Sequence, residues 1–265
     1  MSTPLIILLH SSKTMRTPKS NAPYRAPQLV AQAVELDAYL KTLTPAQLAK
    51  AMHLSAPLAA KTHRLIADWS ASPDQHTVAM DSFVGDIYSG LRASELSAAD
   101  REYADRTLCI LSGLYGVLRP YDSICPYRLE MGYIFPNSPF ANLYTFWGDR
   151  IAKCLPAEGI IVNASSLEYS RTVTAFVDPE RVITPKFLTF NKATGEPAFV
   201  VVHAKIARGA FARWLITSRT TEPTAFAAFT DLGYRFDAAL STPSEPVFVC
   251  QTFGGIGLSM RLALS

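Results

Sequence analysis

Hydrophobic and polar positions along the chain fall into blocks that predict strands and helices in turn. The run Leu5–Leu9 is wholly apolar and rich in branched residues, which is typical of a buried strand in the middle of a sheet. Apolar residues then recur at helical spacing across 27–43, where Pro27 suits the first turn of a helix. The chain therefore begins with a strand, a polar loop and an amphipathic helix.

The same patterns predict the later elements. Helices are expected where apolar residues recur at helical spacing or follow a capping residue such as Thr44, over 44–54, 57–69, 97–111, 143–154, 205–218 and 223–232. Strands are expected over 79–88, 159–163, 181–190, 197–204, around 236, and over 247–252. The strands 181–190 and 197–204 form the clearest hairpin, and 10–26 and 112–132 are expected to be irregular.

Strands that are spread along the chain with helices between them favour a mixed α/β fold. We expect a single domain over residues 1–265, with one mixed sheet packed against helices. The 265 residues, 49% hydrophobic and 18% charged, suffice for one sizeable core and argue against global disorder. The initial apolar run is too short for a signal peptide or a membrane span, so a soluble cytoplasmic protein is expected.

Charge and cysteine usage narrow the possible functions. The 25 Lys and Arg residues against 22 Asp and Glu leave a net charge of +3. Any anionic partner must therefore be held by a local basic patch and not by bulk charge. The cysteines form no CxxC pair and the histidines lack ligands at metal spacing, so neither a metal site nor a cofactor is predicted.

Two polar stretches directly follow predicted strands and are candidates for ligand contacts. In 10–14, hydroxyls, backbone amides and Lys13 could hold a phosphate; the alternative is an ordinary solvated loop. In 163–171, an amide, hydroxyls and Arg171 stand beside Glu168. Glu168 is either catalytic or, more simply, a helix cap.

A third candidate is the glycine-rich stretch 111–132. Its glycines permit close backbone approach, and Arg119 and Arg128 could clamp phosphates bidentately. Glu130 could pair with one of these arginines or act as a general base. The alternative is a rigid structural loop with internal ion pairs.

A fourth candidate is the predicted helix that begins near 204. Lys205, Arg208 and Arg213 lie on adjoining surface through their helical offsets. Such a basic face suits a phosphate backbone. The alternative is a solvated basic surface with no ligand.

Together these stretches resemble the YaaA peroxide stress family. The matching segments stand in family order, at 12–14, 83–91, 111–120, 127–132, 146–149, 163–169, 204–209 and 233–234. The pairing of Ser-Gly-Leu-Tyr-Gly-Val-Leu-Arg-Pro with Tyr-Arg-Leu-Glu-Met-Gly is highly specific. The chain departs from the family in its first loop, at Ile206 where a second Lys is usual, and in the tail 246–265.

The resemblance implies a single-domain fold with a mixed sheet wrapped in helices, known as the cantaloupe fold. It also implies a helix-hairpin-helix element and a positively charged cleft that binds duplex or distorted DNA. The family is linked to peroxide resistance through lowered free intracellular iron, which limits hydroxyl-radical damage to DNA. Residues 44–69 fit the helix-hairpin-helix element by pattern but contain no Gly for the turn, so Gly113 and Gly116 offer an alternative hairpin.

Two functions are therefore weighed. The first is a DNA-binding protein of the peroxide response, whose expected phosphate contacts are Lys13, Arg119, Arg128, Arg171, Lys205, Arg208 and Arg213. The alternative is an enzyme that acts on a nucleotide or another small phosphorylated substrate in the same basic cleft, with Glu130, Glu168 and Lys205 as catalytic candidates. A long open groove would favour DNA, and a deep enclosed cavity would favour a small substrate.

Overall fold

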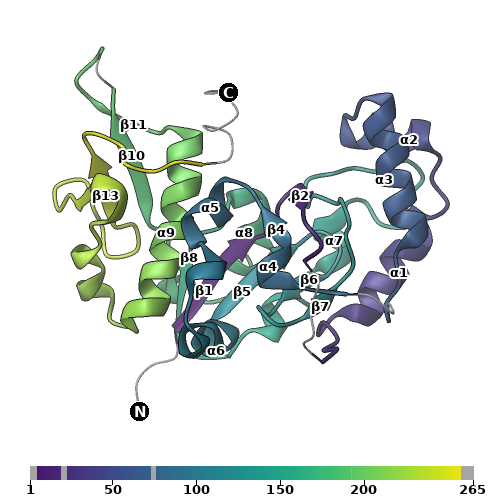
Figure 1. Cartoon of the computed structure of the whole chain (residues 1–265), viewed down its shortest axis with the longest axis horizontal. Helices are drawn as coiled ribbons and strands as arrows, with labels where there is room; N and C mark the ends of the chain where they lie inside the picture. Colours follow the sequence, from purple (N-terminus) through teal and green to yellow (C-terminus); the bar gives the residue numbers. More distant parts are fainter. Residues whose placement is uncertain (1–4, 19–22, 73–75, 192, 258–265) are drawn as a thin grey trace.

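Two β-sheets with helices on their faces form the framework of the computed structural model, which describes residues 5–18, 23–72, 76–191 and 193–257 (Figure 1). The larger sheet has the strand order β6-β5-β1-β8-β9. Its strands are β1 (Leu5–His10), β5 (Leu108–Ser112), β6 (Gly116–Leu118), β8 (Ile160–Asn163) and β9 (Val182–Ile183). The predicted mixed α/β fold class is confirmed.

The first strand occupies the centre of this sheet, as its apolar run predicted. β1 pairs in parallel with β5 on one side and β8 on the other, and Leu5–Leu9 are at most 4% exposed. β9 continues the parallel order, while β6 runs antiparallel on β5. The carboxyl ends of β1, β5 and β8 consequently meet at one edge, where the polar stretches that follow them begin.

The structure has a second sheet in addition to the mixed one, whereas a single mixed sheet was expected. The second sheet has the order β11-β10-β13-β12, formed by β10 (Lys186–Phe190), β11 (Pro197–Ala198), β12 (Tyr234–Phe236) and β13 (Val247–Cys250). The predicted hairpin is confirmed as β10–β11, although β11 is much shorter than 197–204. The sheet is held to α9 (Val201–Ser218) by packed aromatic rings: Phe187, Phe211, Phe229 and Phe248.

Two short antiparallel ribbons link the loops around the larger sheet. They pair β2 (Thr14–Met15) with β4 (Phe83–Val84), and β3 (Thr77–Val78) with β7 (Ser123–Ile124). The expected irregular stretches 10–26 and 112–132 therefore contain short strands. The first ribbon places residues 10–14 beside the segment that begins at Phe83.

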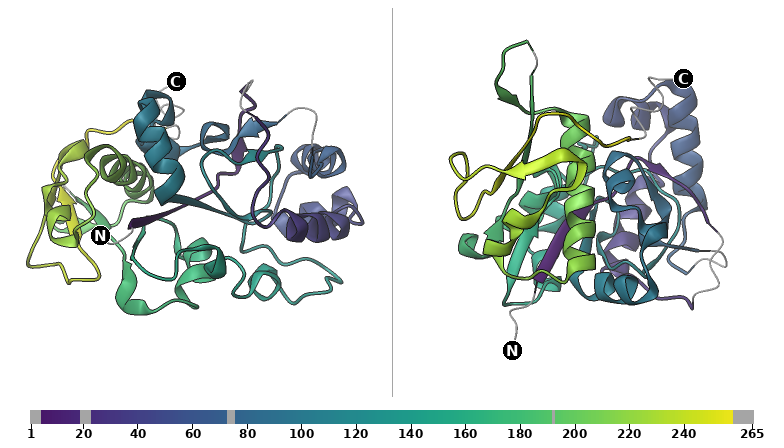
Figure 2. Two further views of the ribbon diagram at one scale, coloured as in Figure 1. Left: turned by 90° about the horizontal axis from the view of Figure 1, so that it is seen from below. Right: turned by 60° about the vertical axis from the view of Figure 1, so that its left-hand side comes forward.

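Helices cover both faces of the larger sheet and form a lobe at one side (Figures 1 and 2). The remaining helices are α1 (Val30–Leu40), α2 (Pro45–Met52), α3 (Ala56–Asp68), α4 (Ala79–Ser82), α5 (Asp86–Leu91), α6 (Ala98–Thr107), α7 (Leu143–Trp147) and α8 (Leu167–Thr174). Short 3-10 segments are η1 (Ala93–Glu95), η2 (Ala152–Cys154), η3 (Pro179–Arg181), η4 (Pro223–Ala228) and η5 (Asp231–Gly233). Thr44 caps α2 as predicted, accepting a hydrogen bond from the Gln47 backbone N–H. None of the described helices is long and apolar enough to cross a membrane.

Several predicted elements were wrong in type or length. The strand expected over 79–88 is a helix, a two-residue strand and a second helix, because Ile87 and Leu91 bury one helical face. The helix expected over 97–111 ends at Thr107, because the following apolar run forms strand β5 of the larger sheet. Only Leu143–Trp147 of 143–154 is α-helical, and 223–232 is 3-10 in character.

The helices α5 and α9 cross in backbone contact, which fixes α9 between the two sheets (Figure 1). A Cβ atom added at Gly90 would lie 2.0 Å from the Ile206 carbonyl oxygen, and one at Gly209 would lie 1.8 Å from that of Ile87. Only glycine permits so close an approach. This crossing sets the position of the amino-terminal half of α9, which carries Lys205 and Arg208.

Candidate functional site

A cavity of about 380 Å³ opens at the carboxyl edge of the larger sheet. All four candidate stretches contribute to its lining, through His10, Lys13, Glu130, Glu168 and, from α9, Lys205. These side chains come from segments far apart in the sequence. They meet because β1 and β8 are parallel neighbours and because the α5–α9 crossing brings α9 to the same edge.

His10, the last residue of β1, is held as a neutral imidazole. Its Nδ1 accepts a hydrogen bond from the Ser166 backbone N–H at 3.2 Å, and its ring stacks on Tyr169 with a centroid separation of 4.8 Å. Burial, together with the nearby charges of Arg208 and Lys205, lowers the pKa of His10 to about 3. Because Nδ1 is an acceptor, the ring proton resides on Nε2.

Three carboxylates, Asp86, Glu130 and Glu168, line the cavity, and the two glutamates are each fixed by a separate partner. Glu130 Oε2 lies 2.8 Å from Lys13 Nζ, and Glu168 Oε1 accepts a hydrogen bond from the Gly132 backbone N–H at 2.8 Å. Glu168 stands in the first turn of α8, but its side chain reaches across to Gly132 and does not cap the helix. A Cβ atom at Gly132 would lie 3.0 Å from that carboxylate oxygen, so the glycine allows this approach.

The two cations beside His10, Lys205 and Arg208, have no ion-pair partner among the described residues. Neither Lys205 nor Arg208 forms a salt bridge or a side-chain hydrogen bond with any residue of the described ranges. Burial lowers the pKa of the Arg208 guanidinium. Arg128 donates to the Lys13 carbonyl oxygen at 3.3 Å, and its buried Nε has no partner in the described part of the chain.

Three of the predicted phosphate contacts are engaged elsewhere. Arg119 Nη2 lies 2.8 Å from the fully buried Asp122 carboxylate, which also binds Arg25. Arg171 lies over the Tyr144 ring at 3.6 Å, and Arg213 Nη1 donates to the Arg92 carbonyl oxygen at 3.1 Å. The structure thus brings Lys13, Lys205, Glu130 and Glu168 into the lining of one cavity, with Arg128 against Lys13 and Arg208 near His10, and keeps the other three arginines in other contacts.

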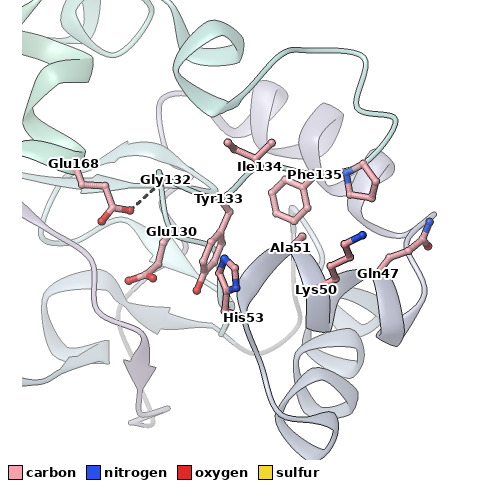
Figure 3. A pocket seen from close by; sticks show the side chains of 11 residues that line it. Gln47, Lys50, Ala51, His53, Glu130, Gly132, Tyr133, Ile134, Phe135 and Glu168 are labelled. Carbon is pink, nitrogen blue, oxygen red and sulfur yellow. Dashed lines mark hydrogen bonds between the residues drawn. The ribbon is translucent and has the colours of Figure 1, made fainter.

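A larger neighbouring cavity of about 700 Å³ lies between α2 and the segment 132–136 (Figure 3). It shares Glu130 and Glu168 with the first cavity, so the two adjoin at these carboxylates. The remaining walls are formed by Gln47, Lys50, Ala51, His53, Gly132, Tyr133, Ile134, Phe135 and Pro136. Burial and the hydrogen-bonded Glu130 carboxylate raise the pKa of Tyr133.

Sequence reasoning missed this second cavity. The signal was present as Tyr133-Ile134-Phe135, an aromatic and apolar run directly after the glycine of a polar stretch. The contribution of α2 had no local signal, because His53 and Lys50 reach the cavity only through the fold. His53 ends α2 with φ at +53°, an uncommon conformation for a residue with a side chain.

A third cavity of about 480 Å³ adjoins the first on its other side. The two share Val84, Gly85 and Tyr88, and the third cavity extends to Arg16 and the segment 254–256. We call the three adjoining cavities the groove. It runs from α2, past His10 and Lys205, to the C-terminal segment. No group of three or more His, Cys, Asp or Glu side chains within the described ranges could hold a metal ion.

Fold and site together define an α/β protein with a charged, ligand-accessible groove at the carboxyl edge of a parallel sheet, the usual location of ligand sites in such sheets. The sequence model of the peroxide stress protein YaaA matches residues 5–240, and the chain belongs to this family. A UPF0246 protein of Salinispora tropica is 57% identical over 97% of this chain and 98% of its own length. A second UPF0246 protein, from Burkholderia multivorans, is 41% identical over 92% and 98%, respectively.

Proposed function

We propose that this chain serves the peroxide stress response by binding DNA, duplex or distorted, in the groove. In this proposal, the bound protein shields DNA from hydroxyl radicals, and the free intracellular iron that generates these radicals is also lowered. Family membership supplies the peroxide stress context. The observation that carries the DNA contact is the unpartnered pair Lys205 and Arg208, since a largely buried guanidinium without an anion is costly and a phosphate would relieve that cost.

The shape of the groove supports an extended ligand. Three adjoining cavities that share lining residues form a continuous open path, which suits a nucleic-acid strand better than a closed hole does. The consecutive helices α2 and α3, which pack on each other, stand at one end, and Lys50 and His53 line the groove there. We propose that this pair acts as the helix-hairpin-helix-like element, with the residues around His53 in place of the usual glycine turn.

Two positions on α9 provide a direct test, with a third as control. Lys205→Ala and Arg208→Gln are each expected to weaken duplex binding by at least about tenfold, because each removes one charge-assisted phosphate contact of about 1.5–3 kcal/mol. Arg213→Gln, on the same helix but held by Arg92 and Glu95, should leave affinity within about twofold of the parent. Fluorescence anisotropy with a labelled duplex measures all three.

The salt series distinguishes phosphate contacts from other effects of these changes. Affinity of the parent should fall as salt rises, because bound cations are released from DNA. The slope of log affinity against log salt should become shallower by about one for each cation removed. A Lys205→Ala, Arg208→Gln double variant that binds the duplex as the parent does would contradict this site.

A second candidate function is an enzyme that acts on a nucleotide or another small phosphorylated substrate. The observation that favours it is that Glu130, Glu168, Lys205 and a neutral His10 line one small cavity. Such a set can exchange protons with a bound ligand, and a DNA-binding surface does not require paired carboxylates. Turnover of nucleoside phosphates that Glu168→Gln abolishes would establish it, and no turnover by the parent would exclude it.

A further inference from the structure

We infer that the two cavities joined at Glu130 and Glu168 bind a single nucleotide that has free sugar hydroxyls. The base would enter the cavity between α2 and 132–136, the sugar would lie at the two carboxylates, and the phosphate would face Lys205 and His10. The ligand is thus a mononucleotide or the 3′-terminal nucleotide of a strand.

The larger cavity has the properties of a base-binding site. Its volume of about 700 Å³ lies within the usual range for small-molecule sites. Tyr133 and Phe135 come from the segment 132–136, with their rings at a centroid separation of 6.3 Å, and Lys50 and the His53 imidazole come from α2 and its carboxyl end (Figure 3). Unstacked bases are commonly held by aromatic rings and by the flat faces of such side chains.

The junction of the cavities suits a sugar. Glu130 and Glu168 line both cavities, and each has one oxygen committed to Lys13 or Gly132, which fixes its orientation. Carboxylate oxygens accept hydrogen bonds from ribose hydroxyls, as in dinucleotide-binding folds. They would repel an esterified phosphate at the same position, so the preferred ligand has at least one free sugar hydroxyl.

The smaller cavity supplies the groups that a phosphate requires. Lys205 lines it without an ion-pair partner in the described residues, and Lys13 offers a second ammonium group beyond its contact with Glu130. His10, neutral with Nδ1 occupied by the Ser166 N–H, has its Nε2–H as the remaining donor. The surroundings along the two cavities thus match a nucleotide in order. The aromatic part suits the base, the two glutamates suit the sugar, and the cations suit the phosphate.

His53 offers a substitution that tests the base site with little cost to the fold. It adopts a left-handed conformation at the end of α2, which costs about 1 kcal/mol for a residue with a Cβ atom, and it lines the proposed base site. This is a common way for a helix to end, and Arg92 and Arg219 end α5 and α9 in the same conformation. His53→Gly would remove the imidazole and relieve the strain, so this variant keeps the fold while testing the site.

The inference shares Lys205 with the proposed DNA contact but does not require duplex binding. Isothermal titration of the intact protein with AMP and UMP should give saturable one-to-one binding, because aromatic stacking is tolerant of the base. Adenosine and 2′,3′-dideoxy-AMP should each bind at least tenfold more weakly than AMP, since they lack the phosphate or the hydroxyls. A single strand with a free 3′ hydroxyl should compete with AMP, whereas the same strand with a 3′ phosphate should not.

Variants locate the site. Tyr133→Leu and His53→Gly should each weaken AMP binding about tenfold, whereas Lys61→Ala, at an exposed position on α3 outside the cavity, should not change it. Absence of saturable binding of both AMP and UMP to the parent, or equal AMP affinity of the parent and His53→Gly, overturns the inference. Loss of duplex binding in Lys205→Ala with normal mononucleotide binding overturns the phosphate assignment alone.

Discussion

The charge state of individual residues is set here by what the fold places around them. His10 is neutral because burial and two nearby cations oppose its protonation and the Ser166 N–H occupies Nδ1. Asp122, fully buried, is shared by Arg25 and Arg119, so Arg119 belongs to the scaffold and not to the groove. Two arginines that look alike in the sequence therefore differ in the structure, because Arg119 is paired with a buried carboxylate and Arg208 has no ion-pair partner among the described residues.

The lowered pKa of His10 predicts a pH dependence of stability. Between pH 6.5 and about 3 the unfolded chain binds a proton at this residue and the folded protein does not, so the free energy of unfolding falls as pH decreases through that window. His10→Asn, whose amide oxygen can still accept from Ser166, should lose this component. Urea unfolding at pH 7 and pH 5 measures it, and equal pH sensitivity of parent and variant would refute it.

Some site residues could be predicted from the sequence and others could not. Lys13, Glu130, Glu168 and Lys205 were expected because they follow strands or belong to polar stretches, and the structure brings them to one cavity. The pairing of Arg119 with Asp122 was within reach, since the two stand three residues apart in a turn. The role of His53 was not, because no local pattern places α2 beside the segment 132–136.

At the scale of elements, the α5–α9 crossing shows why two glycines stand inside helices. Gly90 and Gly209 face each other's backbone, and neither position has room for a Cβ atom. Glycine normally destabilises a helix interior by about 1 kcal/mol, so the close packing of the two helices must stabilise the protein by more than this amount. The sequence pattern predicted a strand over 79–88, so the helix α5 that carries Gly90 was not expected.

Gly209→Ala tests this crossing. The added Cβ atom would lie 1.8 Å from the Ile87 carbonyl oxygen, which forces the helices apart and should destabilise the protein by about 1–3 kcal/mol. Gly195→Ala serves as a control, because no heavy atom stands within 4 Å of its added Cβ atom and only its positive φ opposes the change. Thermal unfolding compares them; a larger loss for Gly195→Ala would contradict the account.

At the scale of the whole molecule, the number of sheets was the main feature that the sequence did not reveal. Individual strands such as β1, β8 and β10 were predicted within a few residues, but a strand pattern carries no record of its partner. β10 pairs in parallel with β13 across more than fifty residues, and the aromatic cluster on α9 separates this sheet from the larger one. The net charge of +3 predicted that only a local patch of cations could hold an anion. The cations that line the groove are few and are mixed with carboxylates.

The interlocked α5 and α9 leave one wall of the groove without freedom to adapt. Two helices whose backbones touch cannot slide or roll past each other without collision, so Lys205 and Arg208 keep a fixed position relative to His10. If the groove widens to admit a larger ligand, the movement must therefore occur elsewhere, at the larger cavity between α2 and the segment 132–136. One wall of the groove is therefore rigid, and the opposite wall has to move when a larger ligand binds.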